Sequence, residues 1–185
     1  AGRRLHILYH AQQELVAYDH TGRIYRYSTI LDHFEQVLHL GQLIQEEVIL
    51  NKLCLDSDGT WWMGADKGLY KQEADHHIVA VLKGQYVNDI AFAGESLFVG
   101  TSNGVWQLSH ALPGKKRQLL EGWNVQTLFC DKPKKELWIG TFGSGLSVMN
   151  LDTSKVLALE GQGSTFLHPI RAITDYDVHT ILIGV

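Results

Sequence analysis

The feature that most constrains this chain is a phrase that recurs along it about every 40 residues. Each clear copy has a large apolar residue, a β-branched residue or Met, a glycine, a polar turn and a second glycine. These copies are residues 62–70 (WMGADKGLY), 98–106 (FVGTSNGVW) and 138–146 (WIGTFGSGL). A partial copy lies at 182–185 (LIGV) and a degenerate one at 15–22 (LVAYDHTG), with Ala17 in the place of the first glycine. A repeat of this length indicates that copies of one supersecondary unit pack side by side.

Each repeat has the pattern of four short strands. The first glycine lies in a strand of apolar and β-branched residues, and the second glycine precedes another strand. Upstream, a pair of apolar residues three positions apart marks a first strand, and turn residues at 56–60 and 131–135 follow it in two copies. The pairs are Leu50 and Leu53, Val87 and Ile90, Val125 and Leu128, and Ile170 and Ile173. The fourth strands are expected at 34–40, 78–82, 117–120 and 156–160.

Four antiparallel strands in each period of about 40 residues predict an all-β fold, a β-propeller of four-stranded blades. The blades are expected at 1–45, 46–83, 84–121 and 122–166, and residues 167–185 supply two strands of a fifth. Residues 41–50 have room for a helical turn at most. Because four and a half blades leave apolar sheet faces open, we expect the chain to belong to a longer protein or to pair with a second copy.

Composition narrows the classes of function. The 185 residues suit one domain, and 16 Lys and Arg against 20 Asp and Glu give a net charge of −4, which argues against a nucleic-acid-binding protein. No apolar run is long enough to span a bilayer, so no direct membrane insertion of this segment is expected. The 18 glycines accompany only 3 prolines, which indicates regular structure rather than a disordered linker.

Two segments carry a resemblance to a known family. Residues 55–70 (LDSDGTWWMGADKGLY) and 136–141 (ELWIGT) closely resemble the two-component regulator propeller repeat. That repeat has an Asp, a polar turn ending in Gly, then Trp-Ile-Gly-Thr, a short loop and Gly-Leu. The similarity is strong over residues 48–150 and weak at both ends, and the first repeat lacks the Trp and the glycine.

The resemblance implies a periplasmic sensor region of a hybrid two-component system from Bacteroidetes. In such proteins seven-bladed propellers precede an immunoglobulin-like domain, a membrane span and a histidine kinase. It further implies an oligosaccharide ligand, partnership with the remaining blades and downstream domains, and a homodimer.

Candidate ligand-binding residues lie in loops and at the starts of the innermost strands, where a propeller scaffold holds variable side chains. The loops between the second and third strands carry His20, Asp66, Asn103 and Phe142. Tyr86 and Trp123 precede innermost strands, and one repeat position just inside them holds Asn51, Asn88, Gln126 and Arg171, which we expect to ring a channel mouth. The same residues could instead be solvated loop positions or could satisfy backbone groups.

Trp123 is the foremost candidate, because it follows Gly122 in a connecting loop and a flat aromatic face suits the apolar side of a pyranose. Trp62, Phe98 and Trp138, which occupy one repeated position, are instead predicted to pack in the core.

The sequence motifs for metal, calcium and phosphate binding are incomplete or absent. His76 and His77 form an adjacent pair in a polar turn, residues 56–59 (DSDG) are a hairpin turn rather than a calcium loop, and no phosphate-binding loop is present. We therefore predict no catalytic residue, metal or cofactor. The basic residues at 114–117 and 132–135 are interpreted as solvated turns, and Cys54 and Cys130 are expected to be free, buried thiols.

The sequence thus predicts a non-enzymatic, ligand-sensing propeller segment that recognises an oligosaccharide and signals to a kinase outside this chain. Two alternatives remain. One is a scaffold for protein–protein interaction, and the other is a propeller lyase, for which His168 and Asp89 are the candidate pair.

Overall fold

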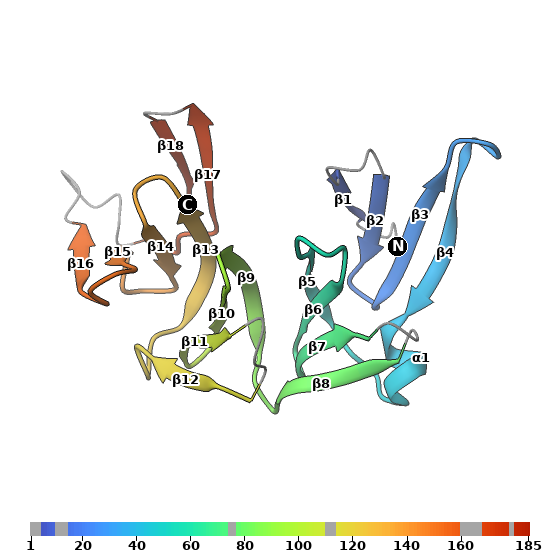
Figure 1. Cartoon of the computed structure of the whole chain (residues 1–185), viewed down its shortest axis with the longest axis horizontal. Helices are drawn as coiled ribbons and strands as arrows, with labels where there is room; N and C mark the ends of the chain where they lie inside the picture. Colours follow the sequence, from blue (N-terminus) through green and yellow to red (C-terminus); the bar gives the residue numbers. More distant parts are fainter. Residues whose placement is uncertain (1–4, 10–14, 74–76, 110–113, 160–167, 178–179) are drawn as a thin grey trace. The chain divides into compact units, whose positions relative to one another are not determined.

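The computed structural model describes residues 5–9, 15–73, 77–109, 114–159, 168–177 and 180–185. These residues form four four-stranded antiparallel sheets and one two-stranded sheet, each built from strands consecutive in sequence (Figure 1). This arrangement confirms the all-β fold and its propeller blades. The chain divides into two compact units, residues 1–84 and 85–185.

Unit 1 contains the first two blades. The strands of each blade pair in sequence order, and one short helix, α1, links the blades. The first blade is β1 (Leu5–Tyr9), β2 (Leu15–Asp19), β3 (Arg23–Ser28) and β4 (His33–His39); α1 is Leu40–Ile44; the second blade is β5 (Leu50–Leu55), β6 (Trp61–Ala65), β7 (Gly68–Gln72) and β8 (Ile78–Lys83). Five residues of helix agree with the single turn expected here.

Unit 2 contains two further blades and the two-stranded sheet. The third blade is β9 (Val87–Ala93), β10 (Ser96–Thr101), β11 (Gly104–Ser109) and β12 (Lys116–Leu119). The fourth is β13 (Val125–Asp131), β14 (Glu136–Thr141), β15 (Leu146–Asn150) and β16 (Val156–Leu159), and the half-blade is β17 (Ala172–Asp177) with β18 (Thr180–Gly184). All four predicted fourth strands lie within one residue of the observed β4, β8, β12 and β16.

The repeated glycine makes room for the next blade. A Cβ at Gly100 would lie 2.7 Å from Cγ1 of Val125, and a Cβ at Gly140 would lie 2.6 Å from Cγ2 of Ile170. Val125 and Ile170 are fully buried and belong to the following blade or half-blade. The glycine therefore lets the first apolar residue of one blade press against the second strand of the blade before it.

In the first repeat, the residue equivalent to the first glycine is not the one that the alignment of the repeats predicted. Gly64 and Gly100 stand opposite the buried residues Leu69 and Val105, whereas in the first blade Tyr18 stands opposite the buried Ile24. Tyr18, and not Ala17, is thus the structural equivalent of the glycine. The alignment was wrong because Arg23 stands between Gly22 and the buried Ile24, whereas Leu69 and Val105 directly follow the second glycines of their repeats. The Tyr18 hydroxyl reaches the second blade and donates to the backbone oxygen of Asn51 at 3.3 Å.

The predicted core aromatics are buried at two of three positions. Trp62 and Phe98 are 1% and 2% exposed, while Trp138 is half-buried. Trp62 Nε1 donates to Asp56 Oδ2 at 2.9 Å, and Asp56 Oδ1 accepts from the backbone nitrogens of Asp58 and Thr60. Asp56 therefore closes the predicted hairpin turn and joins it to the core.

Cys54 and Cys130 are free, as expected, but they are half-buried rather than buried. Burial raises the pKa of the Cys130 thiol, which keeps it protonated at neutral pH.

Candidate functional site

Five of the predicted residues lie in, or hydrogen-bond to, the chain segment 122–126 at the start of β13 in unit 2. We call Asn88, Asn103, Trp123, Gln126 and Phe142 the β13-start cluster. Three of them hold the chain segment 122–125 by direct hydrogen bonds. Asn103 Oδ1 accepts from Gly122 N at 3.0 Å, Asn88 Nδ2 donates to Val125 O at 2.7 Å, and Phe142 N donates to Asn124 O at 2.8 Å.

Asn124, which the sequence analysis missed, links two members of this cluster. Its backbone oxygen accepts from Phe142 N, and its Oδ1 accepts from Gln126 Nε2 at 2.8 Å. The backbone hydrogen bond recurs in other repeats, where the backbone oxygens of Ile49 and Tyr86 accept from the backbone nitrogens of Asp66 and Ser102. The side-chain hydrogen bond of Asn124 could not be found from the sequence, because unrelated residue types fill the equivalent positions in the other repeats.

The two aromatic rings of the cluster differ in exposure. Phe142 is 57% exposed. Trp123 lies in a loop, as predicted, but it is half-buried and packs against the hydrophobic cluster that contains Val125 and Leu128. Its backbone oxygen also accepts from Gly104 N at 2.6 Å. Phe142 therefore offers the more open flat surface, and Trp123 contributes partly to the core.

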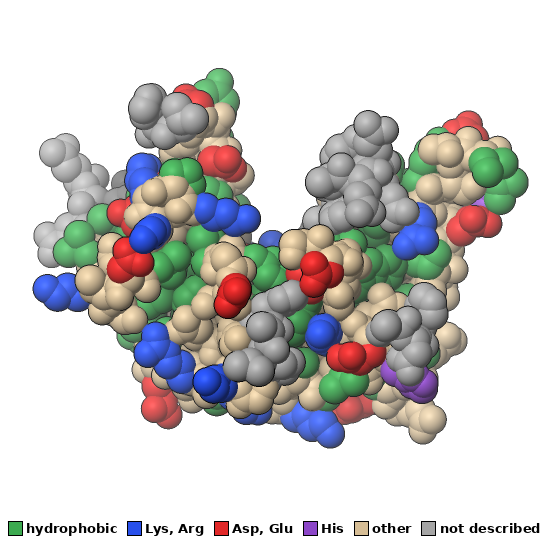
Figure 2. Space-filling view, in the orientation of Figure 1, with side chains coloured by type: hydrophobic (Ala, Val, Ile, Leu, Met, Phe, Trp, Pro, Cys, Tyr) green, Lys and Arg blue, Asp and Glu red, His purple; other side chains and the backbone are tan. Residues whose placement is uncertain are grey.

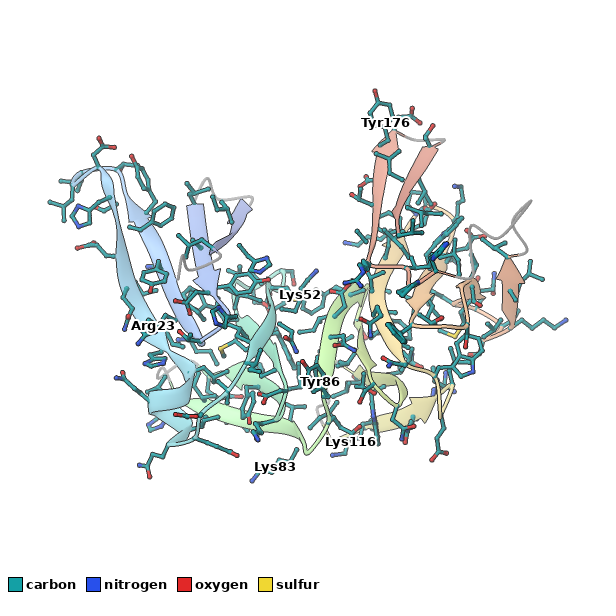
Figure 3. The ribbon with its side chains drawn as sticks, turned by 180° about the vertical axis from the view of Figure 1, so that it is seen from behind. Arg23, Lys52, Lys83, Tyr86, Lys116 and Tyr176 are labelled. Atoms are coloured by element: carbon teal, nitrogen blue, oxygen red, sulfur yellow. The ribbon has the colours of Figure 1, made fainter. Side chains whose placement is uncertain are left out.

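The other candidates at strand starts form hydrogen bonds through their backbone atoms. Tyr86, labelled in Figure 3, is 42% exposed, and its backbone oxygen accepts from Ser102 N at 3.1 Å. Arg171 is exposed, and its backbone nitrogen donates to Gly184 O at 2.9 Å. Asn51 is half-buried, and its backbone oxygen accepts a hydrogen bond from the Tyr18 hydroxyl. The ring of Asn51, Asn88, Gln126 and Arg171 around a channel stays a prediction.

His20 and Asp66 line a pocket of about 810 Å³ in unit 1. Its walls are the β2–β3 turn, α1 with the segment 45–49, and the β6–β7 turn. Asp66 has a structural task, because its Oδ1 accepts from Ile49 N at 2.8 Å. The backbone oxygen of His20 accepts from Leu50 N at 3.0 Å, while its side chain is exposed.

Asp89, the acid of the lyase alternative, joins two blades. It is 6% exposed, and its Oδ2 accepts from the Thr127 hydroxyl at 3.0 Å and from Leu128 N at 2.9 Å. Its Oδ1 accepts from Ile90 N at 2.8 Å. His168 is exposed, ahead of β17. These contacts account for Asp89 as a structural group of β9 and β13.

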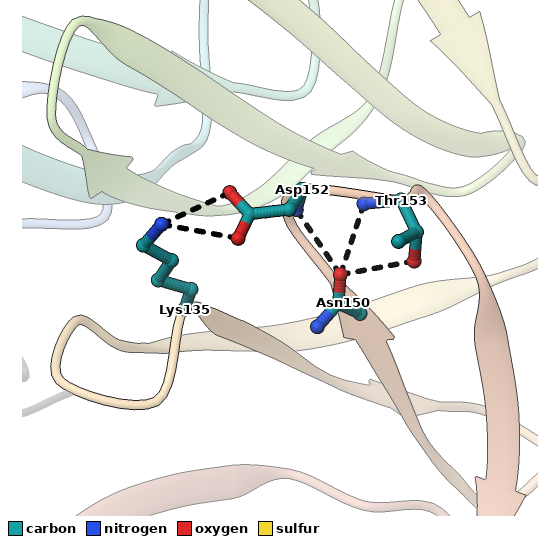
Figure 4. Close-up of polar contacts among 4 residues, drawn as sticks. All are labelled: Lys135, Asn150, Asp152 and Thr153. Carbon is teal, nitrogen blue, oxygen red and sulfur yellow. Dashed lines mark hydrogen bonds and ion pairs between the residues drawn. The ribbon is translucent and has the colours of Figure 1, made fainter.

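The basic turn at 132–135 is held by ion pairs and by the neighbouring turn. Lys134 pairs with Asp131 at 2.9 Å. Lys135 pairs with Asp152 at 3.0 Å, and this pair is drawn in Figure 4. Asn150 Oδ1 accepts from the backbone nitrogens of Asp152 and Thr153 and from the Thr153 hydroxyl. The hydrogen bond from Lys134 lowers the pKa of the Asp131 carboxyl. These contacts support the interpretation of this segment as a structured, solvated turn.

Charges of both signs are interspersed over each unit on the face shown in Figure 2. The described residues hold no group of three or more His, Cys, Asp or Glu side chains placed to bind a metal ion. Of the predicted His76–His77 pair, His76 lies outside the described residues and His77 is exposed. Within the described part of the chain, no helix is both long and apolar enough to cross a membrane.

No protein-family model and no curated protein matches this sequence. Solved structures do share the fold. The extracellular domain of the one-component system BT4673 from B. thetaiotaomicron aligns with 92% of the chain at 16% identity and a TM-score of 0.75. The extracellular domain of the hybrid two-component system BT3049 from B. thetaiotaomicron aligns with 96% at 18% identity and a TM-score of 0.67.

A third structure is PorZ, a surface component of the type-IX secretion system of Porphyromonas gingivalis. It aligns with 97% of the chain at 15% identity and a TM-score of 0.72. The chain spans 24%, 27% and 30% of the BT4673, BT3049 and PorZ chains, respectively. At these identities the likeness shows a common fold.

Proposed function

We propose that this chain is the ligand-sensing part of an extracytoplasmic receptor of the two-component type, and that it recognises an oligosaccharide at the β13-start cluster. The observation that carries the proposal is Phe142, an aromatic residue 57% exposed on a loop whose backbone is fixed by Asn124. The fold that the chain shares with two extracellular domains of bacterial signalling systems supports the sensor role and a periplasmic location.

Recognition follows from the chemistry of the cluster. The face of Phe142, with the open part of Trp123, buries the apolar face of a pyranose ring. The side-chain oxygen of Gln126 and the amide nitrogen of Asn103 are not used in the hydrogen bonds described above, and they can accept from and donate to sugar hydroxyls. Since the loop is held before the ligand arrives, little ordering entropy opposes binding.

Signalling then requires no chemistry in the propeller. Bound sugar shifts the population of arrangements that the propeller adopts with a partner, which we take to be a second copy of the same protein and the downstream domains. The kinase activity of such a receptor lies outside this chain.

The experiment is a glycan-array screen with the purified chain, followed by calorimetry on the best ligand. Phe142→Ala is expected to abolish binding while the melting temperature stays within a degree or so, because the ring is exposed. Tyr176→Ala, which removes a 73% exposed ring on β17 in the same unit, is the control and should bind normally. Glycan cleavage by the purified chain, or unchanged binding by Phe142→Ala, contradicts the proposal.

A scaffold for other proteins is the second candidate function, and the fold likeness to PorZ, a surface component of a secretion system, favours it. The two functions separate in a competition experiment. If a protein partner is captured and a bound glycan does not displace it or change its affinity, the scaffold function is supported instead.

A further inference from the structure

The pocket in unit 1 is lined by free charges of both signs. Lys67, on the β6–β7 turn, supplies a positive charge, and Glu46 and Glu47, on the segment after α1, supply negative ones. None of these three side chains forms a hydrogen bond or ion pair with a described residue. Opposite charges that line one pocket without pairing are available to a ligand.

A fourth charge is held in place. Arg23 Nη1 donates to the Thr21 hydroxyl at 2.6 Å, and that hydroxyl donates to Asp19 Oδ1 at 2.6 Å. The guanidinium, at the start of β3 (Figure 3), is thereby tied to the β2–β3 turn and keeps further donors for a carboxylate.

Two carboxylates of the pocket lining, Glu46 and Asp66, lie close enough to Tyr70 to act on its hydroxyl. Burial raises the pKa of the Tyr70 hydroxyl, and the negative charges of Glu46 and Asp66 raise it further. Asp66 is engaged by Ile49 N, so Glu46 and Glu47 are the carboxylates left for a ligand cation.

Polar groups suited to a peptide backbone complete the lining. The amides of Gln42 and Gln45 have no hydrogen-bond partner among the described residues. His39 Nε2 lies 3.2 Å from Thr21 O, and because a carbonyl only accepts, Nε2 carries the proton. The other nitrogen, Nδ1, is buried without a hydrogen-bond partner among the described residues.

We propose that this pocket binds a short peptide with free ends, whose carboxylate meets Arg23 and Lys67 and whose ammonium meets Glu46 and Glu47. A ligand of one sign would be repelled by one of these pairs, and an uncharged ligand would form no charged contact with either pair. The volume of about 810 Å³ lies within the range of roughly 300–1,000 Å³ typical of small-molecule sites, which is ample for two or three residues. The proposal is independent of the oligosaccharide site in unit 2.

The test uses three probes of similar size on the whole chain. Trialanine carries both charges, N-acetyl-trialanine amide has the same backbone without them, and maltotriose is an uncharged polyol. Titration followed by amide chemical shifts should show trialanine shifting Gln42 and Lys67, with little effect of the other two. Equal binding of the blocked peptide, maltotriose binding alone at the pocket, or no shift with trialanine overturns the proposal.

Matched variants separate the pocket from general charge effects. Lys67→Gln and the double change Glu46→Gln, Glu47→Gln should each weaken trialanine about tenfold, the effect of losing one hydrogen bond to a charged group. Lys83→Gln and Glu35→Gln change exposed charges of unit 1 outside the pocket and should bind like the wild type. Phe142→Ala should leave trialanine binding intact, and loss of binding in that variant contradicts a separate site.

Discussion

At the scale of single residues, the repeated glycine is a packing requirement between blades. Gly100→Ala would put a Cβ 2.7 Å from Val125 Cγ1 and 3.3 Å from Leu128 Cγ, both in the buried core of unit 2. Relieving such an overlap in a packed core costs about 1–3 kcal/mol. We expect the free energy of unfolding, measured by urea denaturation, to fall by this amount.

Gly114→Ala is the matched control, because no described atom lies within 4 Å of a Cβ at that position. Equal stability of the Gly100→Ala and Gly114→Ala variants would contradict the close contact between Gly100 and Val125.

The carboxyl group of Asp19 makes the stability of the folded chain depend on pH. Burial by itself would raise the pKa of this carboxyl, but hydrogen bonds from Thr21 and Arg23 outweigh it, so the pKa is lowered. A lowered folded-state pKa contributes stability above the unfolded value of about 3.9, and that contribution is lost as the pH falls through the folded value. Asp19→Asn should therefore lower the melting temperature near neutral pH, and the difference from wild type should shrink as the pH falls below about 3.9.

The control for this pH effect is Asp58→Asn, which changes an exposed carboxyl in the same unit. A difference between Asp19→Asn and wild type that stays constant with pH would show that the hydrogen bonds do not favour the charged form of Asp19.

At the scale of elements, Asp89 on β9 bridges to β13. Its carboxylate accepts from the Thr127 hydroxyl and the Leu128 nitrogen of the next blade, both buried. Asp89→Ala leaves these donors without a partner, and we expect the free energy of unfolding to fall by roughly 2–4 kcal/mol. Glu95→Ala, in the exposed β9–β10 turn, should have almost no effect. A stable Asp89→Ala variant would return this carboxylate to the list of candidate functional groups.

The strands could be predicted because the same pattern of apolar residues and glycines occurs in several repeats. Alternating apolar residues and the second glycine locate β6, β10 and β14, and the spacing from them places the fourth strands within one residue. The prediction failed in the first repeat because Gly22 precedes the buried Ile24 by two residues rather than one, and it therefore placed Ala17 where the structure has Tyr18.

The site was harder to predict than the strands. Loop residues could be chosen by their repeat position, but their hydrogen bonds join residues far apart in sequence. The side chain of Asn88 hydrogen-bonds to Val125, and the side chain of Asn103 hydrogen-bonds to Gly122. Both side chains therefore hold the chain at the start of β13. The packing of Trp123 against the core likewise depends on contacts that a single repeat does not encode.

At the scale of the whole molecule, the β13-start cluster and the pocket lined by His20 and Asp66 belong to different compact units. Every member of the cluster lies within residues 85–185, which form the second unit. A fragment of these residues should therefore fold cooperatively and bind the glycan selected by the whole chain with the same affinity, within a few fold. Phe142→Ala in the fragment is the control and should not bind. A folded fragment that fails to bind would show that residues of unit 1 are needed for glycan recognition, and an unfolded one that the units are not independent.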